Sequence, residues 1–174
     1  MFEFKITNIK LSVKTSFVCL DSVKVILKKK KLKFKSYPNF IVIKNKYTYI
    51  FFKSKENKVN HLNITSISNF DNIDYSVEHF FNMLDIISFQ EIYRSVDNIT
   101  ASLNLNEKID LLKIVAHFKQ ICNVSYNTEK FPGVFLKYKQ GTIILFHTGK
   151  CIFIGCKNLY SIKYLETQVK SFFN

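Results

Sequence analysis

Residues 131–157, FPGVFLKYKQGTIILFHTGKCIFIGCK, decide the fold because a weaker copy of them stands at residues 37–63. The two copies align at a constant offset, 131 − 37 = 94, without a gap. The matched pairs are Tyr37 with Phe131, Pro38 with Pro132, Thr48 with Thr142, Ile50 with Ile144, and Phe52 with Phe146. The pattern indicates a tandem duplication.

The size of the repeat favours two half-domains related by a pseudo-twofold axis, because the unit is too long for a solenoid repeat. We therefore predict two domains, residues 1–88 and residues 89–174, that each contribute the same surface to one shared site. A chain of 174 residues is long enough for a substantial core, since folding buries roughly 70% of the extended surface at this size.

The charge of the chain points to a polyanionic partner, but it has a second explanation. The formal net charge is +13, and of the 26 basic residues only Arg94 is not a lysine. Clustered lysines gain affinity for nucleic acid by releasing counterions from phosphates, whereas an A·T-rich coding genome produces the same lysine skew with no partner. The run 28–31, with Lys33 and Lys35 after it, is either a solvated face or loop, or a phosphate clamp or import signal.

The residues that carry enzyme chemistry show no catalytic pattern. The histidines form no metal-binding motif, and the chain has no Gly-rich phosphate loop or nucleophile elbow. Cys19, Cys122, Cys151 and Cys156 stand at no metal spacing, and we predict small buried hydrophobes in a reducing compartment. No apolar run approaches the ~18 residues of a membrane span. We expect an intracellular, non-enzymatic protein without cofactor, metal or membrane partner.

Hydrophobic periodicity predicts the same order of elements in both halves. In the second half we predict strands at residues 98–103, around Ser125, and at 134–138, 142–147 and 151–156, with a last helix from about Ser161. A first helix opens at Asn106 and Glu107, and its apolar face consists of Ile109, Leu112, Val115 and Ala116. In the first half we predict strands at 5–13, 40–43, 47–52 and 58–62 and helices at 20–27 and 71–84.

Period-2 counting makes both faces of the second-half sheet apolar. The residues that point to the helices are Ile143, Leu145 and Phe153, and those on the uncovered side are Asn98, Thr100, Ile144, Phe146, Ile152 and Ile154. An uncovered apolar sheet face is either an interaction surface or an aggregation hazard.

The second half resembles the second repeat of the TATA-box-binding protein family of eukaryotes and archaea. The match runs from Asn98-Ile99 through Phe131-Pro132-Gly133 into the final helix, and Thr148-Gly149-Lys150 and Ile154-Gly155-Cys156-Lys157 stand where the family has S-G-K and T-G-A-K. The resemblance implies an α+β fold, the TBP-like saddle: two pseudo-symmetric repeats form a curved ten-stranded antiparallel sheet with helices on the convex face. The concave face of this family lies in a DNA minor groove, which apolar wedges kink.

The resemblance assigns the wedges to aromatic residues at the two ends of the saddle. Phe131 and Phe146, with Pro132 packed beside them, would unstack a base step at one end. Tyr37 and Phe52 would occupy the corresponding positions at the other end. The alternative for each ring is packing in the core or in a loop.

Further contacts with DNA follow from the same resemblance. Asn8 and Asn98 would donate hydrogen bonds to adenine N3 and thymine O2 of central base pairs, acceptors that look nearly the same in A·T and T·A. The floor that excludes the guanine amino group would be Thr100, Ile144, Ile152 and Ile154. Lys150 and Lys157 would hold phosphates, with a merely solvated strand-end lysine as the alternative.

The first half departs from this pattern in its floor and phosphate-contact positions. The residues that correspond to Thr100, Ile152, Ile154 and Lys150 are Lys10, Lys58, Asn60 and Glu56. Charged floor residues would have to be desolvated against base edges, and a carboxylate repels a phosphate. Either these lysines reach phosphates, giving tighter but less selective binding, or this half has lost DNA contact.

The leading hypothesis is a divergent TATA-box-binding-like initiation factor that binds and bends A·T-rich double-stranded DNA. Its protein partners would be a B-type general transcription factor and the RNA polymerase machinery, in a nucleus or viral transcription compartment. Glu129, with Lys35 as first-half counterpart, aligns with an acidic position that contacts the B-type factor in the family; a solvated carboxylate is the alternative. The competing hypotheses are an interaction adaptor of a transcription complex with weak or non-specific DNA binding, and an enzyme-associated domain like the saddle-like repeats of some DNA glycosylases and ribonucleases H.

Overall fold

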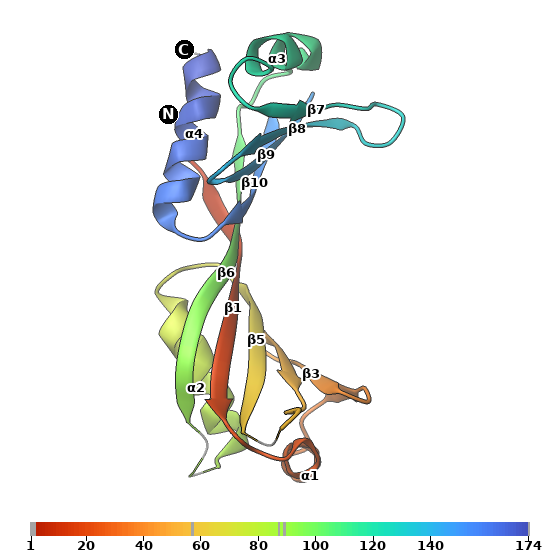
Figure 1. The fold of residues 1–174 in the computed structure, drawn as a ribbon, viewed down its shortest axis with the longest axis vertical. Helices are drawn as coiled ribbons and strands as arrows, with labels where there is room; N and C mark the ends of the chain where they lie inside the picture. Colours follow the sequence, from red (N-terminus) through yellow and green to blue (C-terminus); the bar gives the residue numbers. More distant parts are fainter. Residues whose placement is uncertain (1–2, 57, 87, 89, 174) are drawn as a thin grey trace. The chain divides into compact units, whose positions relative to one another are not determined.

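The computed structural model describes residues 3–56, 58–86, 88 and 90–173, which form ten strands and four helices (Figure 1). The first seven elements are β1 (Lys5–Ser16), α1 (Leu20–Lys29), β2 (Phe34–Ser36), β3 (Phe40–Lys44), β4 (Thr48–Phe52), β5 (Val59–Ile67) and α2 (Asn72–Leu84). The last seven are β6 (Glu91–Asn104), α3 (Leu111–Phe118), β7 (Asn123–Ser125), β8 (Gly133–Tyr138), β9 (Gly141–Phe146), β10 (Lys150–Cys156) and α4 (Leu159–Phe173). The sheet order is β2-β3-β4-β5-β1-β6-β10-β9-β8-β7.

The chain divides into two compact units that exchange the ends of two long strands. The first-repeat unit is Asn8–Asp97, and the second-repeat unit consists of residues 3–7 and 98–173 of the described chain. Strands β1 and β6 therefore contribute to both units. The boundary expected between residues 88 and 89 falls beside Ile87 and Phe89, which lie outside the described residues.

The helices in each unit cover one side of the sheet with apolar stripes at helical spacing. In the first-repeat unit the buried stripe residues are Leu20, Val23 and Leu27 of α1 and Val77, Phe80 and Leu84 of α2. In the second-repeat unit they are Leu111, Ile114 and Phe118 of α3 and Ile162, Leu165 and Val169 of α4. The helix-facing residues expected on β9 and β10, Ile143, Leu145 and Phe153, are fully buried, which confirms that prediction.

The helix expected from Asn106 begins later and buries a different face. Asp110 is its N-cap, and its carboxylate accepts the N–H groups of Leu112 and Lys113 at 2.9 and 3.3 Å. Upstream, Asn106 has a left-handed φ of 59°, and Ile109 N–H donates to the His147 carbonyl. The predicted apolar face was therefore wrong: Leu112 is 69% exposed, and Ala116 is exposed as well.

The cysteine prediction was correct only for the two cysteines of β10. Cys151 and Cys156 are fully buried, and burial raises their thiol pKa values to about 12 and about 11. Cys19 is exposed at the N-cap of α1, where hydrogen bonds from the backbone N–H groups of Asp21 and Ser22 lower its pKa, and Cys122 is half-buried. No helix in the described part of the chain is long and apolar enough to cross a membrane.

Candidate nucleic-acid interface

The side of the second-repeat sheet that faces away from α3 and α4, here called its open face, gathers most of the expected contact residues. Ile144 of β9 pairs with Ile152 of β10, and Ile152 pairs with Ser102 of β6. Ile154 pairs with Thr142 one step further along. These pairings place the following residues on one face: Asn98, Thr100, Ser102, Thr142, Ile144, Phe146, Ile152 and Ile154. The result is an apolar floor bordered by hydroxyl and amide groups.

Three phenylalanine rings form the rim of this open face. The ring centroid of Phe131 lies 4.9 Å from that of Phe135 and 5.6 Å from that of Phe146. Gly133 pairs with Phe146, and a Cβ atom there would come within 2.9 Å of the Phe131 ring. The absence of a side chain at Gly133 therefore leaves room for the Phe131 ring to pack on β8. The rim includes Phe135, which sequence reasoning missed although it alternates with Gly133 on β8.

Asn98 is oriented by a β-bulge in β10. Between Phe153 and Cys156 the register with β6 shifts, and Gly155 adopts a left-handed φ of 77°. The Gly155 N–H donates to Asn98 Oδ1 at 2.7 Å, and Asn98 Nδ2 lies 3.2 Å from Thr100 Oγ1. Because the carbonyl oxygen is engaged, the amide group is left to act as a donor.

The first-repeat unit repeats this device at the equivalent bulge. Ser66 of β5 has a φ of 69°, and its N–H donates to Asn8 Oδ1 at 2.7 Å. Asn8 and Asn98 are therefore structural equivalents with the same orienting hydrogen bond. Ser66 of β5 and Gly155 of β10 are therefore equivalent, and counting back from them aligns the other residues of the two strands.

The expected lysine, proline and glutamate sites all lie in exposed positions. Lys150 begins β10 opposite Asn104, and Lys157 follows the end of that strand. Pro132 and Glu129 belong to the loop between β7 and β8, where Glu129 is exposed. These four side chains are thus accessible to a partner.

Strand register corrects the first-half equivalents that a constant offset assigns. In the first repeat Asn63 lies between Ser12 and Ile50, and it pairs with both. In the second repeat Ile152 pairs with Ser102 on one side and with Ile144 on the other. The residues equivalent to Lys150, Ile152 and Ile154 are therefore His61, Asn63 and Thr65. Lys58, Asn60 and Glu56 were the wrong positions.

The reason for this shift is a longer loop after β4. Eight residues (53–60) separate Phe52 from His61, whereas three (147–149) separate Phe146 from Lys150. Within the loop Lys58 and Glu56 are exposed and form an ion pair at 3.0 Å. Asn60 is fully buried and holds the loop, since it accepts the N–H of Val18 at 2.7 Å and donates to the Phe52 carbonyl at 3.1 Å.

The loop before β3 also differs from its second-repeat counterpart. Residues 37–39 connect β2 to β3, whereas the longer segment 126–132 connects β7 to β8. By register Lys35 corresponds to Ser125, not to Glu129. The Glu129 loop has no full equivalent in the first repeat, and the predicted pairing of Glu129 with Lys35 was wrong.

The rim of the first-repeat open face has three rings in another arrangement. Phe40 pairs with Phe52, just as Gly133 pairs with Phe146 in the second repeat, so Phe40 is the equivalent of Gly133. The ring centroids of Phe40 and Phe52 are 5.6 Å apart. Tyr37 stacks on Phe40 at 4.5 Å with an interplanar angle of 17°. Tyr37 and Phe52 were expected to act together, but Phe40, which sequence reasoning missed, lies against both.

The floor of the first-repeat open face carries a polar cluster, here defined as Lys10, Ser12, Asn63 and Asp97. Lys10 Nζ lies 3.2 Å from Asp97 Oδ2, and Ser12 Oγ lies 2.5 Å from the same oxygen and 3.1 Å from Asn63 Oδ1. Partial burial disfavours the Asp97 carboxylate, but hydrogen bonds from Ser12 and Lys10, with the charge of Lys10, outweigh it and lower the pKa. At the positions of Lys10, Ser12 and Asn63 the second repeat has Thr100, Ser102 and Ile152, none of which is charged.

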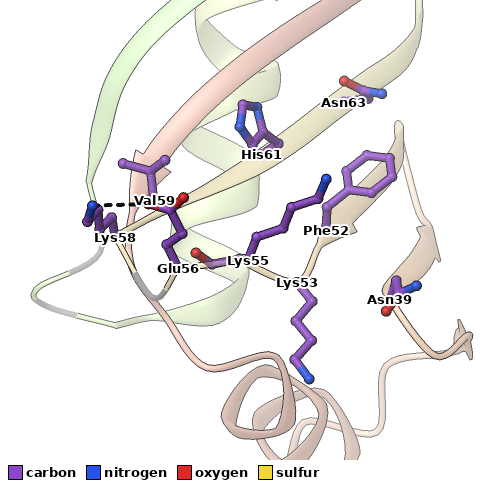
Figure 2. Close-up of a pocket in the computed structure, with 10 residues that line it drawn as sticks. Asn39, Phe52, Lys53, Lys55, Glu56, Lys58, Val59, His61 and Asn63 are labelled. Atoms are coloured by element: carbon purple, nitrogen blue, oxygen red, sulfur yellow. Dashed lines mark ion pairs between the residues drawn. The ribbon is translucent and has the colours of Figure 1, made fainter.

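A pocket of about 950 Å³ lies between this floor and the long loop (Figure 2). It is lined by Phe52, His61 and Asn63 of the open face and by lysines of the loop. Figure 2 shows the Lys55 ammonium group extending over the pocket toward Phe52, while the Lys53 side chain points the opposite way. Lys55 therefore adds positive charge beside the open face.

Comparisons with known proteins agree with this geometry. The family model described as "Transcription factor TFIID (or TATA-binding protein, TBP)" matches residues 94–169. The solved structure of Methanococcus jannaschii TBP superposes with a TM-score of 0.76 at 19% identity, covering 96% of this chain and 95% of that chain. The second repeat thus resembles the TATA-box-binding protein family in sequence, and the chain as a whole has the fold of that family. The expected fold class, the ten-stranded antiparallel TBP-like sheet with four helices, is confirmed.

The family model matches the second repeat, and individual relatives match over stretches of similar length. The TATA-box-binding protein of Methanothrix thermoacetophila is 30% identical over 77 residues, which cover 43% of this chain and 40% of the archaeal protein. That of Spodoptera frugiperda is 33% identical over 69 residues, covering 38% of this chain and 22% of the insect protein. The matches thus span less than half of the relatives' lengths, whereas the structural match spans both repeats.

Proposed function

We propose that this chain is a TATA-box-binding-like transcription initiation factor that binds A·T-rich double-stranded DNA through the minor groove, bends it and recruits transcription machinery. The observation that supports this most strongly is the second-repeat open face. There an apolar floor, a rim of phenylalanines and an oriented asparagine share one side of the sheet.

The floor and Asn98 suit the chemistry of an A·T-rich minor groove. Adenine N3 and thymine O2 are acceptors, and Asn98 Oδ1 is already engaged by Gly155 N–H, so the Nδ2 hydrogen that does not bond Thr100 is the complementary donor. Ile144, Ile152 and Ile154 offer no acceptor for the guanine amino group. Burying that amino group unpaired against isoleucine side chains would cost free energy, so the floor favours A·T pairs.

The rim and the lysines supply deformation and affinity. Phe131 and Phe146 are the wedges of the second repeat, with Pro132 beside them, and unstacking a base step lets the duplex bend around more protein surface. Lys150 and Lys157 contact phosphates from exposed positions. In the first repeat Asn8, Tyr37 and Phe52 take the corresponding roles, with Phe40 added to the rim.

The partner proteins are a B-type general transcription factor and RNA polymerase machinery. Glu129 is the contact residue for the B-type factor, because its loop is exposed and longer than the loop at the equivalent place in the first repeat. Relatives occur in archaea as well as in animals, so we propose a nucleus or a viral transcription compartment only for a eukaryotic host.

The experiment that tests the function compares duplex affinities by gel shift at a stated salt concentration. We expect A·T-rich duplexes to bind more tightly than G·C-rich duplexes of equal length. The double variant Phe131→Ala with Phe146→Ala should lose most of this affinity while retaining the wild-type circular dichroism spectrum. Equal affinity for both duplexes, unchanged in the double variant, would refute groove insertion.

A second candidate function is favoured by the polar cluster of the first repeat. The ion pair of Lys10 with Asp97, and that of Lys58 with Glu56, place carboxylates on or beside the first-repeat open face. A protein-interaction adaptor with weak or non-specific DNA binding would tolerate these charges. Co-purification of general transcription factors after nuclease treatment, together with micromolar or weaker DNA affinity, would favour this adaptor.

A further inference from the structure

The polar cluster of the first-repeat open face replaces an uncharged floor of the second repeat, and at Asn63 it replaces an apolar residue. Asn63 is the register equivalent of Ile152, and Lys10 is the equivalent of Thr100, as Asn8 is of Asn98. All four cluster residues are half-buried, so their polar atoms are within reach of a groove edge. A floor of this kind presents donors and acceptors instead of methyl groups.

The hydrogen-bond arithmetic at Ser12 determines which groups of the cluster remain available. The hydroxyl carries one proton, yet its oxygen lies within hydrogen-bond distance of both Asp97 Oδ2 and the Asn63 side-chain amide. The ionised Asp97 is the stronger acceptor and the closer one, at 2.5 Å, so it takes the proton. The structure places Asn63 Oδ1 at 3.1 Å from Ser12 Oγ, which would leave two acceptors facing each other. We therefore assign the Asn63 amide the other way round, with Nδ2 donating to Ser12 Oγ, because asparagine oxygen and nitrogen are assigned from their partners.

With this assignment the Asn63 carbonyl oxygen is the amide atom that does not contact Ser12. Figure 2 shows Asn63 on β5 beyond His61, on the side of the pocket and not among the helices. The carbonyl oxygen is therefore a half-exposed acceptor on the floor. Nearby, the Lys10 ammonium group is a donor whose charge offsets that of Asp97.

We propose that the first repeat accepts G·C base pairs, with Asn63 receiving a hydrogen bond from the guanine 2-amino group. In the minor groove this amino group is the one donor that distinguishes G·C from A·T pairs. An acceptor at Asn63 satisfies it, whereas Ile152 at the equivalent place in the second repeat cannot. The inference rests on the proposed DNA-binding function and makes the preferred DNA site asymmetric, with A·T pairs on one repeat and G·C pairs on the other.

The test uses inosine, which pairs with cytosine but lacks the 2-amino group. Single G·C pairs are placed in turn at each position of an A·T-rich duplex, and each is compared with its I·C counterpart by fluorescence anisotropy at fixed salt. For positions in one half of the site we expect guanine to bind more tightly than inosine, by on the order of tenfold. For positions in the other half we expect inosine to bind more tightly.

Two exchanges between equivalent positions assign these halves to the repeats. Asn63→Ile should abolish the preference for guanine in the first half and leave the second half unchanged. Ile152→Asn should remove the penalty against guanine in the second half. Asn63→Ala serves as a second variant in case the isoleucine disturbs the fold, and it should abolish the guanine preference as well; circular dichroism melts check that each variant is folded.

The outcomes separate this inference from the proposed function. A wild-type preference for inosine, or no preference, at every position of a duplex that still binds would overturn the role of Asn63 and leave A·T-rich binding intact. A guanine preference that survives in folded Asn63→Ile and Asn63→Ala would also overturn it. Absence of binding to every duplex tested would remove both proposals together.

Discussion

The two open faces share their backbone devices and differ in their floors. In each, an asparagine at the same place on its strand accepts a backbone N–H from a β-bulge at 2.7 Å, and in each three aromatic rings gather at the rim. The floor, however, is isoleucine in the second repeat and a hydrogen-bonded polar cluster in the first. Strand geometry depends on the bulge and the buried helix-facing side, so the exposed floor is free to diverge without loss of the fold.

The rims provide the largest expected difference between the repeats. Phe131→Ala with Phe146→Ala should weaken binding to an A·T-rich duplex on the order of 100-fold, since each stacked ring contributes ~1–3 kcal/mol. Phe40→Ala with Phe52→Ala should weaken binding to the same duplex by only about tenfold. Tyr37 lies flat on Phe40 and carries a hydroxyl that opposes insertion between bases, so the first-repeat rim is the weaker wedge. Anisotropy titrations at matched salt measure both; a larger loss for the first-repeat pair would reverse the assignment of the stronger wedge.

The asparagines provide the next largest effect, and here the two repeats should behave alike. Asn8→Ala and Asn98→Ala each leave a bulge N–H without its acceptor, which should lower the free energy of unfolding by about 1–2 kcal/mol. Urea denaturation measures this loss. The matched control is Asn98→Asp, which keeps an acceptor for Gly155 but loses the amide donor. It should preserve stability and still weaken A·T binding, and loss of stability in this control would argue against the bulge contact.

The bulge residues themselves sharpen the comparison through backbone strain. Ser66 and Gly155 both have left-handed φ values, 69° and 77°, but only glycine adopts them without cost. A Cβ atom at Gly155 would meet nothing closer than 3.7 Å, so Gly155→Ser should destabilise by about 1 kcal/mol from conformation alone. Ser66→Gly should stabilise the folded protein by less than about 1 kcal/mol, because glycine also has more conformational freedom in the unfolded chain. Thermal melts of the two variants should therefore shift in opposite directions.

The long loop of the first repeat adds a smaller, salt-dependent effect. Lys55 extends over the pocket and forms no ion pair within the described part of the chain, whereas Lys53 in the same loop points away. If Lys55 neutralises one phosphate, Lys55→Ala should reduce the slope of log K against log[salt] by about 0.9. Lys53→Ala removes the same charge and should leave the slope unchanged. Equal changes in both variants would mean that overall charge, not the pocket, determines the slope.

The smallest expected effect is the pH dependence of the polar cluster. The pKa of Asp97 is lowered, so its contribution to stability is present above its unfolded value of about 3.9 and is lost as pH falls through the folded pKa. The side chain is 31% exposed, so solvent screening should keep this contribution below about 1 kcal/mol. Melting temperatures between pH 7 and pH 3 should fall less steeply in Asp97→Asn than in the wild type, and identical slopes would contradict this role.

Sequence periodicity was sufficient to predict most elements because their buried stripes are regular. The strands of the second repeat and the stripe Ile162, Leu165 and Val169 of α4 follow the expected spacing closely. It failed at α3, where four apolar residues at helical spacing outweighed the capping signal of Asp110. Strand β2, only three residues long, was missed because so short a segment carries no period.

The candidate site could be predicted in the second repeat and only partly in the first. Motif residues such as Phe131 and Asn98 occur with their family neighbours, so their positions follow from the sequence. In the first repeat no family signature marks the end of the loop after β4, and a gapless offset assigned the floor to Lys58 and Asn60. Hydrogen-bonded pairing moved it to Asn63 and Thr65. The cluster at Asp97 was not predicted, because its contacts join strands far apart in the chain.

What the amino-acid sequence determined by itself was the duplication, the alternation of buried and exposed strand residues, and the family of the second repeat, since these depend on local periodicity and contiguous motifs. Only the tertiary structure decided which first-repeat residues share the floor with Ser12 and which rings form its rim. The physical reason is that loop length changes sequence offset freely, whereas the pairing of backbone N–H and C=O groups sets which side chains become neighbours.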